Sequence, residues 1–362
     1  MKQNFKGFLK ASIGLLGLSS LAILLQRKQH ARQSRIRSPQ GIQENVIIQA
    51  GGIPQALQLR GNQRTNPVIL WVHGGPGMAN PFLTYAYQPA LEEDYTFAYW
   101  SQRGAGRTYY LNQGQVSGMT LAQVIDDMDE VVDYLRARFK QEKIFIIGHS
   151  WGSQVSSLYI KTHPHKVKAY LGVSQIIDII ASQRSLLDQA ESAAQASGDE
   201  DGLLEIRSLK RASDDQLNHR LIPAQDYLTI EQVAGKYLPG NPLTDALKGT
   251  WLALTAPDFS WMDIRWYGLF LFQLSHYIAI QAPLMIVSNQ FKLAQGDSYQ
   301  VPVYFVSGGR DWTAPFSQVF NYYQSITAPD KAFYLLKDCG HSPYLDDPDR
   351  FADRVRACFS HY

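Results

Sequence analysis

Strand-like and helix-like segments alternate along most of this 362-residue chain, and that alternation limits its fold more than any other feature. A continuous apolar run at 68–72 ends at a glycine-rich loop, as a strand buried on both faces should. A second run, at 143–147, leads directly into a predicted helix. Between them, the apolar residues of 121–139 keep the i, i+3, i+4, i+7 spacing of a helix packed on a sheet. We therefore predict an α/β fold with a mostly parallel central sheet and helices on both faces.

The start of the helix at 121–139 carries a capping signal. Thr120 and Gln123 have the spacing of a capping box, in which each side chain binds an exposed backbone N–H group of the first turn. The sequence predicts both halves of this box.

The alternation stops after a predicted strand at 167–173 and resumes with another at 301–306. The residues between them indicate helices and loops, which we interpret as an insertion into a single domain. The expected organisation is an N-terminal membrane anchor or signal-like segment with a basic linker (1–40), a first core segment (41–175), a helical lid (176–298) and a second core segment (299–362).

The N-terminus has a membrane-targeting pattern. An apolar stretch of 15 positions, Ala11 to Leu25, follows three lysines and precedes a basic run. This is shorter than the ~20 residues that span a bilayer, but snorkelling of Lys10 would extend it. No clear small-x-small cleavage site follows Leu25, which favours an uncleaved anchor over a signal peptide and secretion. The side of the membrane stays open.

Charge and cysteine content limit the partners. With 34 Lys and Arg against 32 Asp and Glu, the net charge is only +2, so no basic field favours nucleic acid. The two cysteines, Cys339 and Cys358, cannot form a disulfide framework and lack the spacing of a zinc site. We expect no metal and no cofactor, and the oligomeric state stays open.

The turn after the run at 143–147 is the most chemically informative motif. Residues 148–152 read Gly-His-Ser-Trp-Gly, which fits G-x-S-x-G between a buried strand and a helix. A serine on such a strained turn holds its oxygen clear of the backbone, and the flanking glycines avoid a clash. Ser150 is therefore the predicted nucleophile.

A serine nucleophile needs a base to take its proton and an acid to orient that base. Asp311 follows the predicted strand at 301–306, and His341 follows one at 332–336. Both lie in loops beyond the carboxyl ends of strands, in the chain order Ser, Asp, His. Asp338 competes with Asp311 but more plausibly shapes the loop of His341. The remaining histidine candidates are interpreted as structural: His149, His163, His165 and His276.

The loop at 73–77, His-Gly-Gly-Pro-Gly, provides backbone N–H groups directly after a strand. Acyl transfer needs such donors where negative charge develops on the substrate oxygen. We predict that Gly75, with Gly74 as the next candidate, and Trp151 form the oxyanion hole. His73 is expected to anchor the loop.

Taken together, these motifs resemble the α/β-hydrolases of the proline iminopeptidase group. The resemblance rests on five segments: 73–77, Gln-Arg-Gly-Ala-Gly-Arg at 102–107, 148–152, Gly-Arg-Asp at 309–311, and Gly-His at 340–341. It implies an α/β-hydrolase fold and a serine peptidase that removes an N-terminal residue, often proline, from small peptides. Two positions depart from the family pattern: Ser101 replaces an aspartate, and His149 replaces a glycine of the elbow.

Such peptidases bind the free amino terminus through lid carboxylates. The sequence does not choose among the acids of the expected lid, most of which should lie on solvated helix faces: Glu191, Asp201, Glu205, Asp214, Asp215, Asp226 and Glu231. An aminopeptidase acting on a small peptide is the first interpretation. A carboxylesterase, lactonase or lipid hydrolase with the same triad is the second, and a non-catalytic binding protein on the same scaffold is the remote third.

Overall fold

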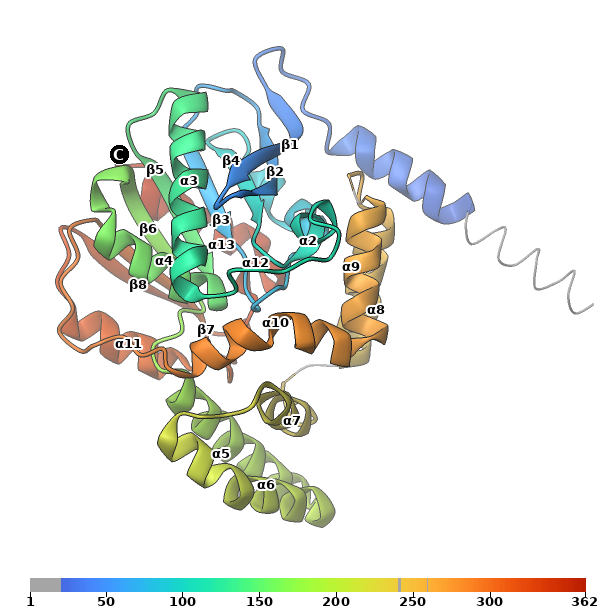
Figure 1. Cartoon of the computed structure of the whole chain (residues 1–362), viewed down its shortest axis with the longest axis vertical. Coiled ribbons are helices and arrows are strands. Elements are labelled where there is room, and N and C mark those ends of the chain that lie inside the picture. The colour runs from blue at the N-terminus through green and yellow to red at the C-terminus, as the bar shows by residue number, and fades with distance from the viewer. Residues whose placement is uncertain (1–20, 240–241, 259) are drawn as a thin grey trace, which may run out of the picture.

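The computed structural model describes residues 21–239, 242–258 and 260–362. Its centre is an eight-stranded sheet with the order β1-β2-β4-β3-β5-β6-β7-β8 (Figure 1). The strands are β1 (Ile42–Ala50), β2 (Ile53–Gly61), β3 (Val68–Val72), β4 (Thr96–Ser101), β5 (Ile144–His149), β6 (Val167–Val173), β7 (Val303–Gly308) and β8 (Lys331–Leu336).

The sheet is mostly parallel, as predicted. Strands β4, β3, β5, β6, β7 and β8 pair in parallel. The departure is at one edge, where β1 and β2 form an antiparallel hairpin and β2 pairs antiparallel with β4. The hairpin turns at Gly51 and Gly52, which both have positive φ.

Helices cover both faces of the sheet, as expected for strands that are apolar throughout. Val68, Leu70 and Val72 pack in one cluster with α3 and α4, whereas Ile69 and Trp71 pack in a second cluster with α13. This explains the unbroken apolar run of β3. The helices of the core are α2 (Gly106–Leu111), α3 (Leu121–Phe139), α4 (Trp151–Thr162), α11 (Phe316–Ser325), α12 (Pro343–Asp346) and α13 (Pro348–Phe359), with short 3₁₀ helices η1 (Pro81–Ala86), η2 (Gln88–Ala90) and η3 (Pro164–Lys166).

The capping box predicted at α3 forms only in part. The Thr120 hydroxyl accepts a hydrogen bond from the Gln123 N–H at 3.1 Å. The Gln123 side chain instead donates to Asp127, one turn further along the helix. The Thr120 N–H donates to the Gly118 carbonyl, so the tight turn before the helix replaces the second half of the box.

The chain between β6 and β7 forms a group of helices that lies at one end of the sheet (Figure 1). These are α5 (Ile179–Ser197), α6 (Glu200–His219), α7 (Ala224–Gly235), α8 (Pro242–Thr255), α9 (Trp261–Phe272) and α10 (Leu274–Asn289). Helices α5, α6 and α7 pack on one another through apolar residues that join the main core cluster.

Before β1, residues 21–33 are helical. Most of the predicted anchor, Ala11 to Leu25, lies outside the described residues. Among the residues that the structure describes, no single helix is long and apolar enough to cross a membrane; α9 and α10 meet that test only as a pair, bent by 98°.

Candidate active site

Ser150 occupies a strained turn between β5 and α4. Its φ is +54°, in the region that favours glycine. The two flanking glycines are required by space: a Cβ on Gly152 would lie 2.0 Å from the Val72 carbonyl oxygen, and one on Gly148 would lie 2.7 Å from the Gly152 carbonyl oxygen. The close approach of α4 to β3 therefore requires Gly152, and the close approach of the first turn of α4 to the end of β5 requires Gly148.

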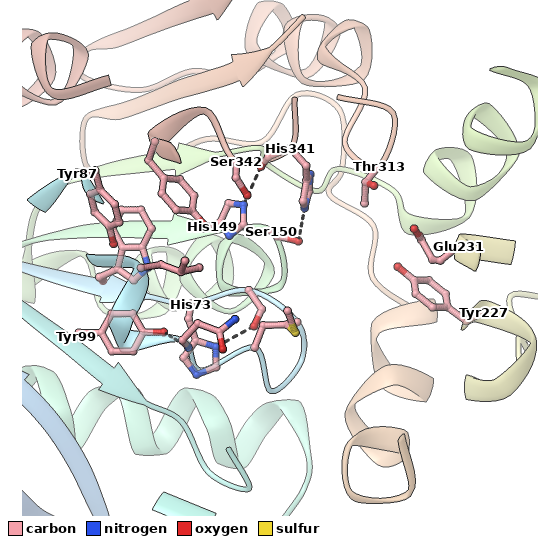
Figure 2. Close-up of a pocket in the computed structure, with 17 residues that line it drawn as sticks. His73, Tyr87, Tyr99, His149, Ser150, Tyr227, Glu231, Thr313, His341 and Ser342 are labelled. Carbon is pink, nitrogen blue, oxygen red and sulfur yellow. Dashed lines mark hydrogen bonds between the residues drawn. The ribbon is translucent and has the colours of Figure 1, made fainter. Parts of the chain in front are cut away.

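The three side chains predicted to form a triad lie in one hydrogen-bonded row, and Figure 2 shows two of them, Ser150 and His341. Nε2 of His341 is 3.0 Å from the Ser150 hydroxyl oxygen. On its other side, Nδ1 of His341 is 3.0 Å from both carboxylate oxygens of Asp311. Ser150 follows β5, Asp311 follows β7 and His341 follows β8, so residues beyond the carboxyl ends of three strands on one side of the sheet meet at one point.

The charges of this row stabilise one another. Burial alone would lower the pKa of His341, but the charge of Asp311 and its hydrogen bond outweigh burial and raise it above the usual value. Burial would likewise raise the pKa of Asp311, yet His341 and the Ala314 N–H keep it below its usual value. Asp311 is therefore a carboxylate at neutral pH, placed to hold the Nδ1–H of His341.

The two other histidines near the row make main-chain contacts. His149 lies beside His341, and its Nε2–H donates to the His341 carbonyl at 2.9 Å. His73 donates from Nδ1 to the Gly74 carbonyl and accepts the Gln102 N–H at Nε2. Burial lowers the pKa of His149 to about 3 and that of His73 to about 4, so both rings are neutral at physiological pH.

The loop at 73–77 lies next to Ser150. A Cβ on Gly74 would be 3.1 Å from the Ser150 Cβ, closer than ordinary van der Waals contact, so a larger residue here would require its neighbours to shift. Gly75 has a φ of +125°, and a Cβ there would meet the Gly77 nitrogen at 2.5 Å. Trp151 is the first residue of α4, where N–H groups have no partner within the helix. The structure thus brings both predicted oxyanion donors to the nucleophile.

A cavity of about 300 Å³ opens beside this row. Its lining combines residues from the strand ends with Tyr227 and Glu231 of α7, which lie across the cavity from Ser150 (Figure 2). Four aromatic side chains also line it: Trp71, Tyr87, Tyr99 and Tyr344. The inserted helices thus form one wall of the site.

Glu231 is the lid acid that lines this cavity. Its carboxylate accepts a hydrogen bond of 2.7 Å from Gln183 on α5. Burial raises the pKa of Glu231, while Gln183 and the charge of His341 act against that rise. The other six lid acids named from the sequence make contacts elsewhere or are exposed: Glu191 (with Arg207 and Lys210), Glu205 (Lys236), Asp214 (Arg184), Asp215 (His219), Asp226 (Gln216) and Asp201 (exposed).

The motif at 102–107 is structural. Arg103 forms a buried bidentate ion pair with Asp127 of α3. Arg107 pairs with Asp263, which also caps the start of α9. Ser101, which replaces the aspartate of the family pattern, is buried, and its carbonyl accepts a hydrogen bond from Thr108. The arginines therefore tie this segment to α3 and to the lid, outside the cavity.

The remaining candidates of the sequence lie away from the cavity lining. Ring stacking on Tyr159 places His163 beside α4, and Asp338 pairs with exposed Arg310. His276 is exposed on α10, and His165 lies in η3. Within the described residues, no group of three or more His, Cys, Asp or Glu side chains is placed to hold a metal ion.

An eight-stranded sheet in this order, with a serine elbow after its central strand β5, defines the class of protein: it is an α/β-hydrolase. The chain belongs to the alpha/beta hydrolase fold family, whose model matches residues 67–348. The fold class predicted from the sequence is confirmed.

Curated relatives extend this assignment over most of the chain. A protein named "Probable aminopeptidase YbaC", from Bacillus subtilis (strain 168), is 26% identical over 325 residues, which are 87% of this chain and 96% of that protein. The proline iminopeptidase of Heyndrickxia coagulans is 22% identical, over 85% of this chain and 95% of its own. A solved membrane phospholipase A shares the fold, with a TM-score of 0.60 and 15% identity; it covers 100% of this chain and 99% of its own. The chain is thus a hydrolase related to aminopeptidases and proline iminopeptidases.

Proposed function

We propose that this protein is a serine aminopeptidase of the proline iminopeptidase type, which releases an N-terminal residue from small peptides. The observation that carries the proposal is the position of Glu231, whose carboxylate lines the same cavity as Ser150 and His341. A carboxylate attracts an ammonium group strongly where little water screens the pair. The free amine of the substrate binds at Glu231, and its first peptide bond lies at Ser150.

In the proposed reaction, the Ser150 oxygen attacks the carbonyl carbon while its proton moves to Nε2 of His341. Asp311 holds the Nδ1–H and stabilises the imidazolium. The N–H groups of Gly75 and Trp151 donate to the oxyanion. His341 then gives its proton to the leaving amine, and water attacks the acyl-enzyme in the same way to release the residue.

The proposal is tested first with a proline amide whose amino terminus is either free or acylated. We expect Ser150-dependent hydrolysis of the free amine only, with Ser150→Ala as the blank. No amide turnover, combined with cleavage of a simple ester by the same serine, would move the function to a carboxylesterase, lactonase or lipid hydrolase. The five Trp and Tyr side chains that line the cavity, Tyr227 among them, favour that second candidate, because they suit an apolar acyl or alcohol group.

Glu231→Gln tests the amine site separately. A hydrogen bond to a charged group contributes about 1.5–3 kcal/mol, so we expect kcat/KM for the free amine to fall about 10- to 150-fold. Cleavage of a simple ester should change little. Glu205→Gln is the matched control, because Glu205 pairs with Lys236 at the surface. Equal losses for both substrates would contradict an amine-binding role.

The remote alternative is a non-catalytic binding protein. Labelling by a fluorophosphonate separates it from an enzyme, since the reagent needs an activated serine. We expect labelling that disappears in Ser150→Ala, and folded protein that takes up no label would overturn the enzymatic proposal.

A further inference from the structure

Helices α8 and α9 each carry large exposed apolar side chains, which are together called the lid face. Trp261 and Phe272 of α9 are 71% and 82% exposed, and they are eleven residues apart, which places them on one side of the helix. On α8, Leu247, Trp251 and Leu254 are also exposed at i, i+4, i+7 spacing. Large apolar side chains gathered in this way mark a contact surface.

The N-terminal helix, residues 21–33, lies against the connection between α8 and α9. The Arg27 side chain donates to the Pro257 carbonyl at 3.2 Å, and Nδ1 of His30 lies 3.2 Å from the Thr255 carbonyl oxygen. The N-terminal helix and α9 lie near one another on the same side of the molecule (Figure 1). The helix that contains the end of the N-terminal apolar stretch therefore lies beside the lid face.

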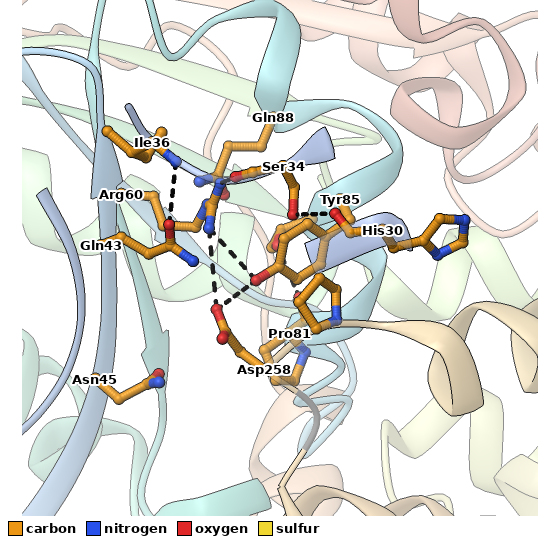
Figure 3. Close-up of polar contacts among 12 residues, drawn as sticks. His30, Ser34, Ile36, Gln43, Asn45, Arg60, Pro81, Tyr85, Gln88 and Asp258 are labelled. Carbon is orange, nitrogen blue, oxygen red and sulfur yellow. Dashed lines mark hydrogen bonds and ion pairs between the residues drawn. The ribbon is translucent and has the colours of Figure 1, made fainter. Parts of the chain in front are cut away.

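Arg60 fixes this arrangement (Figure 3). Its buried guanidinium pairs with Glu92 at 2.7 Å and donates to the Ser34 carbonyl at 2.5 Å. Asp258, in the α8–α9 connection, lies 3.9 Å from the same guanidinium and accepts a hydrogen bond from Tyr85. One buried cation thus joins the segment after the N-terminal helix, the sheet and the lid. The helix is held to the body instead of acting as a loose tether.

Charge around the lid face favours an anionic partner. The first acidic residue of the chain is Glu44, so the described residues before β1 carry five Lys and Arg side chains and no acid: Arg27, Lys28, Arg32, Arg35 and Arg37. Asp258 of the α8–α9 connection pairs with Arg60, and Asp263 of the first turn of α9 pairs with Arg107. Basic and apolar side chains in one region suit a membrane that contains anionic lipids.

We propose that the lid face rests on the surface of an anionic lipid bilayer, beside the point where the N-terminal apolar stretch enters it. Trp261 and Phe272 lie at the boundary of headgroups and acyl chains, and the basic residues of 27–37 contact the headgroups. The opposite side of α9 carries Trp266, which donates to the Gly77 carbonyl of the loop beside Ser150. The same helix therefore contacts the bilayer and the active-site loop.

The test uses the full chain in vesicles of phosphatidylcholine and phosphatidylglycerol. An environment-sensitive thiol dye is attached to Trp261→Cys, Phe272→Cys, Leu21→Cys or the control Leu204→Cys, which replaces an exposed leucine of α6. The native cysteines should react little, because both are buried and burial raises the pKa of Cys339 to about 11. Quenching by spin-labelled lipids reports contact with the bilayer.

We expect about twofold or greater quenching at positions 261, 272 and 21, and little at 204. Dyes at 261 and 272 that are quenched no more than the dye at 204 would overturn the proposal, even if the dye at 21 were quenched. A blue shift at 261 and 272 without lipid quenching would also overturn it, since a second protein copy would then cover the face.

In a second measurement the dye is attached to Leu247→Cys on α8, and the large side chains of Trp261 and Phe272 are removed. Trp261→Ser/Phe272→Ser should abolish most of the quenching at position 247, whereas Leu204→Ser should leave it unchanged. Unchanged quenching in the double variant would show that these residues do not hold the lid face to the bilayer.

Discussion

At the scale of the residue, His149 is a positioning residue that acts through His341. Its Nε2–H and the Ser174 hydroxyl both donate to the His341 carbonyl. His149→Phe keeps a ring but removes one donor, at a cost of about 1 kcal/mol, so we expect kcat to fall about fivefold with KM unchanged. The pKa of His149 is about 3, so the acid limb of the pH profile should stay in place. A shifted acid limb in steady-state kinetics would contradict this positioning role.

His341 sets the pH dependence of the proposed reaction. It acts as a base only when neutral, so kcat/KM should rise with pH as His341 loses its proton. Because Asp311 raises that pKa, the midpoint should lie above the usual value of about 6.5. Asp311→Asn should move the midpoint to lower pH and cut turnover by orders of magnitude. Titration of the imidazole by NMR measures the shift directly; an unchanged midpoint would remove Asp311 as its cause.

The site residues differ in how far the sequence could predict them. Ser150, Asp311 and His341 each follow a predicted strand, so the topology of a parallel sheet implies that their loops meet at one edge. Glu231 carries no such signal, because its neighbours in the sequence resemble those of other helical acids. Its place depends on how α7 packs over the strand ends, which only the three-dimensional structure shows.

At the scale of the element, the Arg103–Asp127 pair ties the loop after β4 to α3. Both side chains are buried. Asp127→Ala would leave a buried guanidinium without its partner, and we expect the free energy of unfolding to fall by about 3–5 kcal/mol. Asp133→Ala is the control, because Asp133 is half exposed in its pairs with Arg136 and Lys166 and should contribute about 0–1 kcal/mol. Urea unfolding measures both, and equal losses would contradict the buried pair's role.

Strands buried on both faces were the elements that the sequence predicted best. Every residue of Val68–Val72 is apolar because its side chain packs in one or the other of the two clusters. The observed β3 has the predicted bounds. The antiparallel β1–β2 hairpin was missed because β1 alternates buried and exposed residues without an apolar run. The docking of the N-terminal helix was missed because it depends on single contacts from Arg27, His30 and Arg60.

At the scale of the whole molecule, the lid and the core are joined through main-chain carbonyls of two loops, the loop at 73–77 beside Ser150 and the loop after β4. Tyr277 donates to the Pro76 carbonyl at 2.6 Å, Trp266 to that of Gly77 at 2.9 Å, and Gln281 to that of Gly104 at 2.7 Å. All three donors are buried side chains of α9 and α10. The position of the Gly75 N–H therefore depends on helices that are far from it in the sequence.

Tyr277→Phe tests this coupling. The change removes the donor to Pro76 but keeps the ring in its aromatic cluster with Trp266 and Phe270. Loss of one hydrogen bond of about 1 kcal/mol should lower kcat about fivefold, with KM nearly unchanged, because the proposed oxyanion donor Gly75 would stabilise charge only in the transition state. The affinity for a peptide aldehyde, whose adduct resembles that state, should fall in parallel.

Tyr304→Phe is the matched control for Tyr277→Phe. Its hydroxyl pairs with Asp330 and Tyr362 near the opposite, amino-terminal end of β7, away from Asp311. We expect Tyr304→Phe to lower the free energy of unfolding about as much as Tyr277→Phe does, but to leave kcat and the affinity for the aldehyde unchanged. If both variants lowered kcat equally, general loosening of the fold would explain the effect, and the lid would have no specific part in placing the oxyanion donors.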